Sequence, residues 1–279
     1  MNSRYSDVLE ALDRLCKAED SIKCVTAIGS STRESVKADE YSDLDLIIVT
    51  DDPDSWISGN FPGRLGDISI SFTEPTIGGG TERRVIYGGD RDADFIIHTP
   101  EQFTEFVTSG LATVLMNRGH RVLYDAGDYT SLLNKHVVSS VRQPQLTEGE
   151  FVNLVSDFFF HNIWAYKKLK RGELWSAKLC VDSYLKARLL TVAELYFSRK
   201  NSADVWHDGR FIDRWADKAF LDDLSRCFAR YDKEDVFSAL QNTHSLFAQT
   251  ARACAELLSF AYPEKAEETA CHYLNDLRL

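Results

Sequence analysis

The chain has 279 residues, of which 44% are hydrophobic and 27% charged, as expected for an ordinary globular protein long enough for two domains. Its 43 acidic and 32 basic residues leave a formal net charge of −11, which argues against binding to nucleic acid, because neutralising phosphates requires a basic surface. The chain has no apolar run of membrane-helix length, no secretory signal at its acidic amphipathic start and no C-x-x-C pair, so we expect a cytoplasmic protein with reduced thiols and no membrane partner.

The first half of the sequence predicts a mixture of strands and helices. Residues 4–17 carry apolar side chains at helical spacing, and the β-branched segments 22–29 and 44–50 predict strands. Residues 66–74 alternate apolar and polar side chains, as a half-buried strand does. Residues 81–100 predict two strands joined at Gly88-Gly89-Asp90, with a helix opened by Thr99 and Pro100.

The second half contains only helical patterns. After residues 137–147, three long segments repeat apolar residues at helical spacing, namely 150–172, 173–197 and 234–262. We therefore predict an α+β protein: a mixed-sheet domain over residues 1–140, followed by a helical bundle over residues 141–279.

Two aspartates interrupt the second apolar strand. Asp43 and Asp45 are two residues apart, so in a strand they point to one face while Leu44 and Leu46 point to the other, toward a core. Like charges so placed repel, and a divalent cation such as Mg²⁺, which prefers carboxylate oxygens, removes the conflict. The alternative is a solvated strand face.

The surroundings of this pair indicate phosphate chemistry. Gly29-Ser30 ends the preceding strand, and a glycine there lets backbone N–H groups approach an anion. Asp94 begins an apolar stretch in the hairpin, and Asp92 competes with it because a one-residue slip in register exchanges the faces. Three carboxylates beside such a turn suit two-metal phosphoryl transfer. No histidine has the spacing of a metal site.

Gly29-Ser30, twelve intervening residues and Asp43-Leu44-Asp45 resemble the signature of the polymerase-β-like nucleotidyltransferase superfamily. Much of the chain is similar to the antibiotic nucleotidyltransferases, in particular the aminoglycoside 6-adenylyltransferase (streptomycin adenylyltransferase) family. The similar stretches are "YSDLDLIIVTDDPDSW", "RDADFIIHTPEQF", "ELWSAKLCVDSYLKARLL" and "ALQNTHSLFAQTARACAELLSFAYP". That family tends to place an arginine directly after the Gly-Ser, whereas here Ser31 follows and Arg33 comes later.

The resemblance implies transfer of AMP from ATP to a hydroxyl of an aminoglycoside-type antibiotic, with Mg²⁺ as cofactor and release of pyrophosphate. Asp43 and Asp45 would hold the metal, and Asp94 would be the general base, a third metal ligand or both. Gly29, Ser30 and Arg33 would contact the phosphates.

The helical domain is expected to close the site on a small cationic acceptor. Lys178 resembles a family position whose ammonium meets the phosphates, and Asp182, one helical turn later, would recognise an ammonium group of the acceptor. A solvated lysine and a surface Lys–Asp pair explain the same spacing. Glu173 and Trp175 are weaker candidates for acceptor binding, and most tryptophans of this half are expected in the core.

Two further functions remain open at this point. The first keeps the chemistry and changes the acceptor to a lincosamide or another hydroxylated small molecule. The second is a regulatory or toxin–antitoxin protein with a nucleotidyltransferase fold. The retained carboxylates argue against a protein without catalytic activity, and the size of the helical domain argues against a minimal regulatory module.

Overall fold

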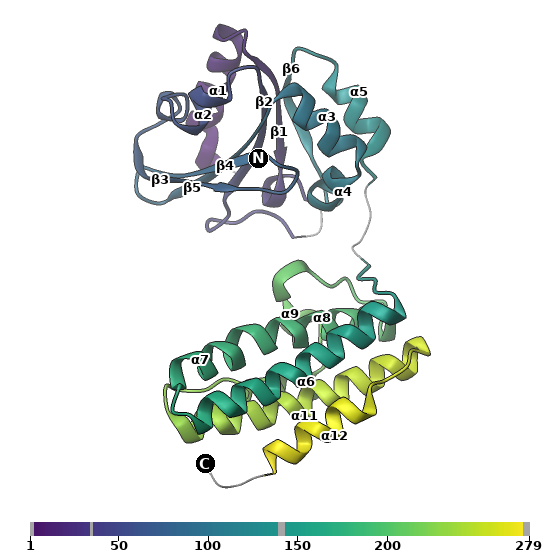
Figure 1. The fold of residues 1–279 in the computed structure, drawn as a ribbon. Helices are drawn as coiled ribbons and strands as arrows, with labels where there is room; N and C mark the ends of the chain where they lie inside the picture. The colour runs from purple at the N-terminus through teal and green to yellow at the C-terminus, as the bar shows by residue number, and fades with distance from the viewer. Residues whose placement is uncertain (1–2, 34–35, 139–142, 276–279) are drawn as a thin grey trace. The chain divides into compact units, whose positions relative to one another are not determined.

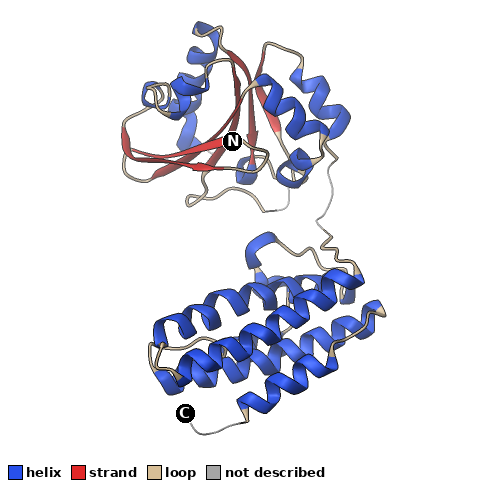
Figure 2. Cartoon of the chain, viewed as in Figure 1, coloured by secondary structure: helices blue, strands red, loops and turns tan. Residues whose placement is uncertain are grey.

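The computed structural model describes residues 3–33, 36–138 and 143–275 of the chain. It divides into two compact units, Met1–Val141 and Arg142–Leu279, whose buried side chains form separate cores. The first unit combines a sheet with helices and the second is helical (Figure 2). This confirms the predicted α+β class.

The first unit is built on a six-stranded mixed sheet, as far as the described residues go. The strands have the order β3-β4-β5-β2-β1-β6, in which β2 and β5 are parallel and every other neighbouring pair is antiparallel. The strands are β1 (Ile22–Ile28), β2 (Leu44–Thr50), β3 (Ile68–Pro75), β4 (Thr81–Tyr87), β5 (Arg91–His98) and β6 (Arg121–Asp125). The predicted hairpin at Gly88-Gly89-Asp90 is confirmed, since Tyr87 pairs with Arg91.

Helices cover both faces of this sheet (Figure 1). They are α1 (Ser6–Ala18), α2 (Pro53–Ile57), α3 (Pro100–Thr108), α4 (Leu111–Met116) and α5 (Tyr129–His136). Leu44 and Leu46 face a core shared with α1 and α2, whereas Ile47 and Val49 face a second core shared with α3, α4 and α5. The strand β2 is therefore apolar on both faces, except where Asp45 replaces a hydrophobic residue.

Local capping explains where several helices begin. Thr99 caps α3 in a capping box with Gln102, and Pro100 occupies the first turn, as predicted. Asp52 caps α2 through its side chain, with Pro53 in the first turn.

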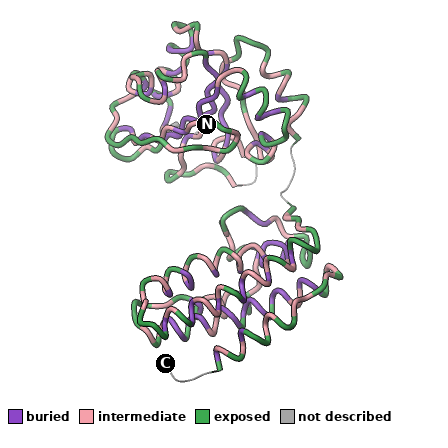
Figure 3. Tube along the Cα trace, in the orientation of Figure 1, coloured by how far each residue is buried: buried purple, intermediate pink, exposed green. Residues whose placement is uncertain are grey.

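One burial prediction for the first unit was wrong. Residues 66–74 do form a strand, but most of β3 is exposed rather than half-buried, with Ile70 57% and Phe72 51% exposed. The reason is its place at the edge of the sheet, where it pairs with β4 alone among the described strands. Burial is concentrated in the central strands (Figure 3). The elements β6, α4 and α5 were not predicted.

The second unit consists of helices around one core. They are α6 (Glu148–Lys170), α7 (Leu174–Leu179), α8 (Leu185–Lys200), α9 (Ile212–Trp215), α10 (Lys218–Ser225), α11 (Lys233–Leu258) and α12 (Glu264–Leu274). The three predicted long helices correspond to α6, to α7 with α8, and to α11. A π-helical segment, Cys180–Tyr184, joins α7 to α8, so the predicted helix over 173–197 changes its pitch at that point.

The structure also bears on the state of the cysteines and on the presence of membrane-spanning helices. All six cysteines are free thiols, as expected. Among the described residues, no helix combines the length and apolar character that crossing a bilayer requires.

Candidate active site

Three aspartates from neighbouring strands meet at one end of the first unit's sheet. Asp94 on β5 lies in parallel register with Asp45 on β2, and Asp43 directly precedes β2. One oxygen from each of Asp43, Asp45 and Asp94 lies within 4.8 Å of the others. The structure therefore brings together the three carboxylates singled out in the sequence.

Asp92, the competitor of Asp94, lies two residues earlier on β5 and does not pair with Asp45. Its residue is exposed, and its backbone carbonyl accepts a hydrogen bond of 2.8 Å from the Tyr5 hydroxyl. Because residues 92 and 94 are in the same strand, the register with β2 decides which of them reaches Asp45. The observed register selects Asp94.

Burial and neighbouring charges make the carboxyls of Asp45 and Asp94 hard to ionise. Burial, followed by the charges of Asp43 and Asp94, raises the pKa of Asp45 to about 8. Asp94 is only 9% exposed, and burial raises its pKa to about 7, although the Arg84 guanidinium opposes the shift. An oxygen-only set of crowded acids fits Mg²⁺, which would relieve the repulsion.

Gly29 makes close approach to this cluster possible. It has a φ of +68°, and a Cβ atom at this position would lie 2.0 Å from Oδ2 of Asp45. Ser30 is buried, and its hydroxyl donates a hydrogen bond of 3.3 Å to the carbonyl of Asp43. The predicted Gly-Ser turn therefore lies against the carboxylates, and its glycine is required by both space and conformation.

Arg33 also lies within electrostatic reach of the cluster. Its positive charge lowers the pKa of Asp45, in opposition to burial and the neighbouring acids. The guanidinium is thus near the carboxylates although it comes later in the turn than the family pattern places it.

Sequence reasoning missed two residues of this site, Glu82 and Arg84 on β4. Arg84 pairs with Asp94 across the hairpin, and its Nε lies 3.7 Å from Oδ2 of that residue. The same Nε lies 2.9 Å from carboxylate oxygens of Glu82 and Glu74. The hairpin turn contained the signal, because pairing Tyr87 with Arg91 places Arg84 opposite Asp94.

In the second unit, Lys178 and Asp182 form an ion pair, and Lys178 also donates to the carbonyl of Ala229. Both side chains are only 23% exposed, so the pair is not a fully solvated one. The Oδ1 atom of Asp182 is buried and has no hydrogen-bond partner within the described part of the chain.

The weaker candidates, Glu173 and Trp175, have different surroundings. Glu173 forms ion pairs with Lys168 and Arg171, which lower the pKa of its carboxyl. Trp175 is 66% exposed, although most tryptophans of this half were expected in the core. Trp206 and Trp215 are buried as expected.

The chain is similar to known proteins at the level of a family model and of solved structures. The family model of streptomycin adenylyltransferase matches residues 3–277. No curated protein matched the chain. Twelve chains of solved structures are similar to it, and two of them illustrate the likeness. The first is an aminoglycoside 6-adenyltransferase from Bacillus subtilis, with 14% identity, a TM-score of 0.46 and coverage of 98% of both chains.

The second is a nucleotidyltransferase-like protein from Exiguobacterium sibiricum 255-15, with 12% identity, a TM-score of 0.36 and coverage of 92% of this chain and 78% of that one. Both TM-scores are too low to support an assignment of function. The assignment follows from the family match over nearly the whole chain. The chain belongs to the streptomycin adenylyltransferase family and is a nucleotidyltransferase.

Proposed function

We propose that this protein transfers AMP from ATP to a hydroxyl of an aminoglycoside-type antibiotic and releases pyrophosphate, with Mg²⁺ as cofactor. One observation carries the proposal: in a chain of this family, Asp43, Asp45 and Asp94 lie together beside the Gly29-Ser30 turn.

The carboxylates of Asp43 and Asp45 are the proposed ligands of the metal, with Asp94 as a further ligand. A bound divalent cation would neutralise the triphosphate and stabilise the charge that develops on the leaving pyrophosphate. The crowding of the three acids supports this role, because each carboxylate is more stable as an anion when a cation lies between them.

Asp94 is the proposed general base. As the acceptor hydroxyl attacks the α-phosphorus, a new O–P bond forms, the bond from that phosphorus to the bridging oxygen breaks, and pyrophosphate leaves with the bond electrons. The hydroxyl proton passes to the carboxylate of Asp94. A pKa raised to about 7 suits a group that accepts a proton near neutral pH. Arg84 would hold this carboxylate in place from the neighbouring strand.

The turn at Gly29 and Ser30 is the proposed phosphate contact, with Arg33 as a counter-charge. Because Gly29 has no Cβ, the carboxylate of Asp45 lies directly against the turn, so a phosphate bound beside that carboxylate would meet the backbone of the turn. Arg33, already within reach of Asp45, would contribute positive charge to the same region.

The second unit is the proposed acceptor-binding domain, and Asp182 is its proposed ammonium ligand. The buried Oδ1 of Asp182 makes no hydrogen bond to the described residues, so it retains the capacity to accept one from a ligand. Lys178, held by Asp182 and Ala229, is the proposed phosphate contact from this unit. Glu173 is a weaker candidate for binding the acceptor substrate, because Lys168 and Arg171 already neutralise its charge.

Pyrophosphate release tests the proposal. The purified chain is incubated with ATP, Mg²⁺ and one acceptor at a time, and the product is identified by mass spectrometry. We expect adenylylated streptomycin or a related aminoglycoside. Turnover with clindamycin but with no aminoglycoside would replace the acceptor class by the lincosamides. Absence of turnover with every acceptor would contradict the proposed activity and favour a regulatory role.

A further inference from the structure

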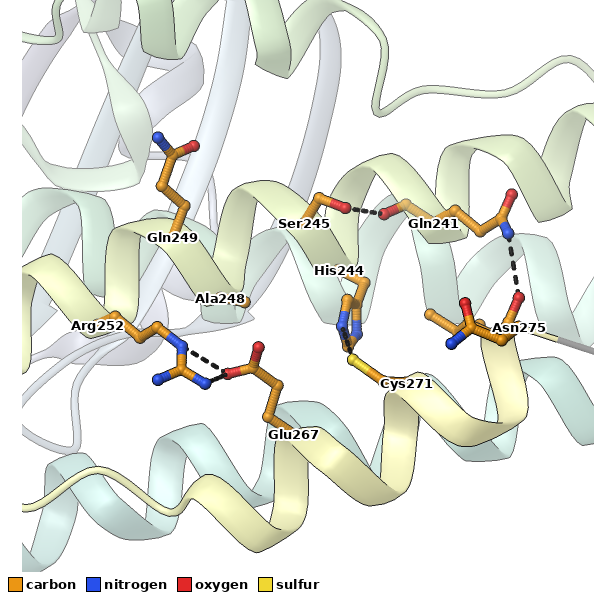
Figure 4. A pocket seen from close by; sticks show the side chains of 10 residues that line it. Gln241, His244, Ser245, Ala248, Gln249, Arg252, Glu267, Cys271 and Asn275 are labelled. Carbon is orange, nitrogen blue, oxygen red and sulfur yellow. Dashed lines mark hydrogen bonds and ion pairs between the residues drawn. The ribbon is translucent and has the colours of Figure 1, made fainter.

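A second group of metal-ligating side chains lies in the second unit, on two helices that the proposed chemistry does not use. His244 on α11 and Glu267 and Cys271 on α12 each offer one ligand atom, and these atoms lie within 4.8 Å of one another. They line a pocket of about 450 Å³ (Figure 4).

The arrangement follows from helical spacing. Glu267 and Cys271 are four residues apart on α12, so they point to the same side of that helix. Ala270 and Leu274, each three residues after one of these two, lie on the same face of α12 and are buried in the core of the unit. The burial of these two residues fixes the rotation of α12 and turns Glu267 and Cys271 toward His244 (Figure 4).

The observed distances suit a tetrahedral ion. Zinc binds sulfur at about 2.3 Å and imidazole nitrogen at about 2.0–2.1 Å, which places two tetrahedral ligands roughly 3.5 Å apart. Nε2 of His244 lies 3.2 Å from Sγ of Cys271. A small outward movement of the Cys271 side chain, which is only partly buried, is enough to admit the ion.

Glu267 is oriented as a metal ligand would be. Its Oε2 atom accepts hydrogen bonds from Nε of Arg252 at 3.0 Å and from the Tyr262 hydroxyl at 2.5 Å. Among the described residues, no hydrogen bond or ion pair uses its other oxygen, Oε1. Ligating carboxylates are commonly held through one oxygen in this way while the other binds the ion.

His244 is directed at the cluster through Nε2. It is only 6% exposed, and in the described part of the chain the hydrogen-bond partner of its ring is Sγ of Cys271. A reactive thiolate–imidazolium pair is the main alternative to a metal site. Such a pair does not account for Glu267, whose carboxylate oxygen lies within 4.8 Å of the ligand atoms of both other residues.

We propose that His244, Glu267 and Cys271 form a zinc site, with the fourth position open to the pocket. One nitrogen, one thiolate and one carboxylate suit zinc better than magnesium or calcium, which prefer oxygen alone. On binding, Cys271 releases its proton to solvent, and the two anionic ligands balance the charge of the ion. The ion would tie α11 to α12, so zinc stabilises the second unit.

Cobalt spectroscopy of the full chain tests this site. Co²⁺ is added to the reduced protein, and the sulfur-to-cobalt charge-transfer band in the near ultraviolet is recorded. The carboxylate cluster of the first unit has no sulfur and gives no such band. We expect the band in the wild type, its displacement by an equivalent of Zn²⁺, and its loss in Cys271→Ser and His244→Asn.

Two variants serve as controls. Cys254→Ala removes a buried thiol of α11 outside the cluster, and Asp45→Asn alters the proposed magnesium site, and both retain the band. Zn²⁺ also raises the Tm of the wild type more than that of Cys271→Ser. No band in the wild type, a band that survives in Cys271→Ser, or equal stabilisation of both proteins would overturn the proposal. None of these readouts depends on adenylyl transfer.

Discussion

Asp45 and Asp94 lie opposite each other on two adjacent parallel strands, although they are far apart in the sequence. A hairpin and a helix separate the two strands along the chain, so the pair exists only because β5 inserts beside β2 in this register.

Asp45→Asn removes one carboxylate of the proposed metal site while preserving the size of the side chain. We expect adenylyl transfer to fall at least about 100-fold, because altering even the groups that support a metal ligand costs roughly 10–100-fold. Initial rates of pyrophosphate release measure the effect. Asp92→Asn is the control at the exposed end of β5, outside the group of three carboxylates, and its rate stays near that of the wild type. Equal losses in the two variants would contradict the assignment.

Removal of metal makes the stability of the protein depend on pH. The pKa values of Asp45, about 8, and Asp94, about 7, lie above the value near 3.9 of an unfolded aspartate. Between these limits the folded state binds more protons than the unfolded state, so stability is lost as the pH rises, by at most about 1.4 kcal/mol per pH unit for each group. Melting curves in EDTA between pH 5 and 8 measure this trend.

Magnesium is expected to reverse that loss. Because it binds the ionised carboxylates, its stabilising effect is larger at pH 8 than at pH 6. Asp45→Asn removes one of the two titrating groups, so it melts at a higher temperature than the wild type in EDTA at pH 8 and responds less to magnesium. If the Tm of the wild type in EDTA did not change with pH, the proposed crowding of the two aspartates would be contradicted.

Gly29→Ala places a methyl group against Oδ2 of Asp45. We expect activity to fall at least about 100-fold, because the phosphate contact and the carboxylate are both displaced. Gly79→Ala is the control, since Gly79 has a similar φ of +79° but no atom within 4 Å of a built Cβ. Both variants pay about 1–2 kcal/mol for the left-handed conformation, measured by chemical denaturation. Activity lost to the same extent in both would attribute the effect to strain alone.

Asp182→Asn tests recognition of the acceptor. A charged hydrogen bond contributes about 1.5–3 kcal/mol, so we expect the KM for the acceptor to rise roughly 10- to 100-fold, more than the KM for ATP, which changes only through the loosened Lys178. Asp222→Asn alters the Lys218–Asp222 pair, which has the same spacing but is exposed, and it leaves both constants unchanged. An unchanged acceptor KM in Asp182→Asn would reduce that residue to a structural partner of Lys178.

Local patterns were enough to predict the elements that carry the first-unit site. The aspartates of β2 and the Gly-Ser turn are visible in the chain because apolar strands rarely contain paired acids, and the Gly88-Gly89 hairpin follows from turn chemistry. Short or weakly patterned elements such as β6 and α4 were missed, and the exposure of β3 depends on its place at the sheet edge.

By itself, the sequence determined the α+β class, the family and the residue types needed for phosphoryl transfer, because these depend on periodicity and on motifs of a few residues. Tertiary structure decided which acids meet. It chose Asp94 over Asp92 through the register of β5 with β2. It also brought His244 to Cys271 from another helix. Such contacts depend on how separate elements pack, so they cannot be predicted from the spacing of residues within one segment.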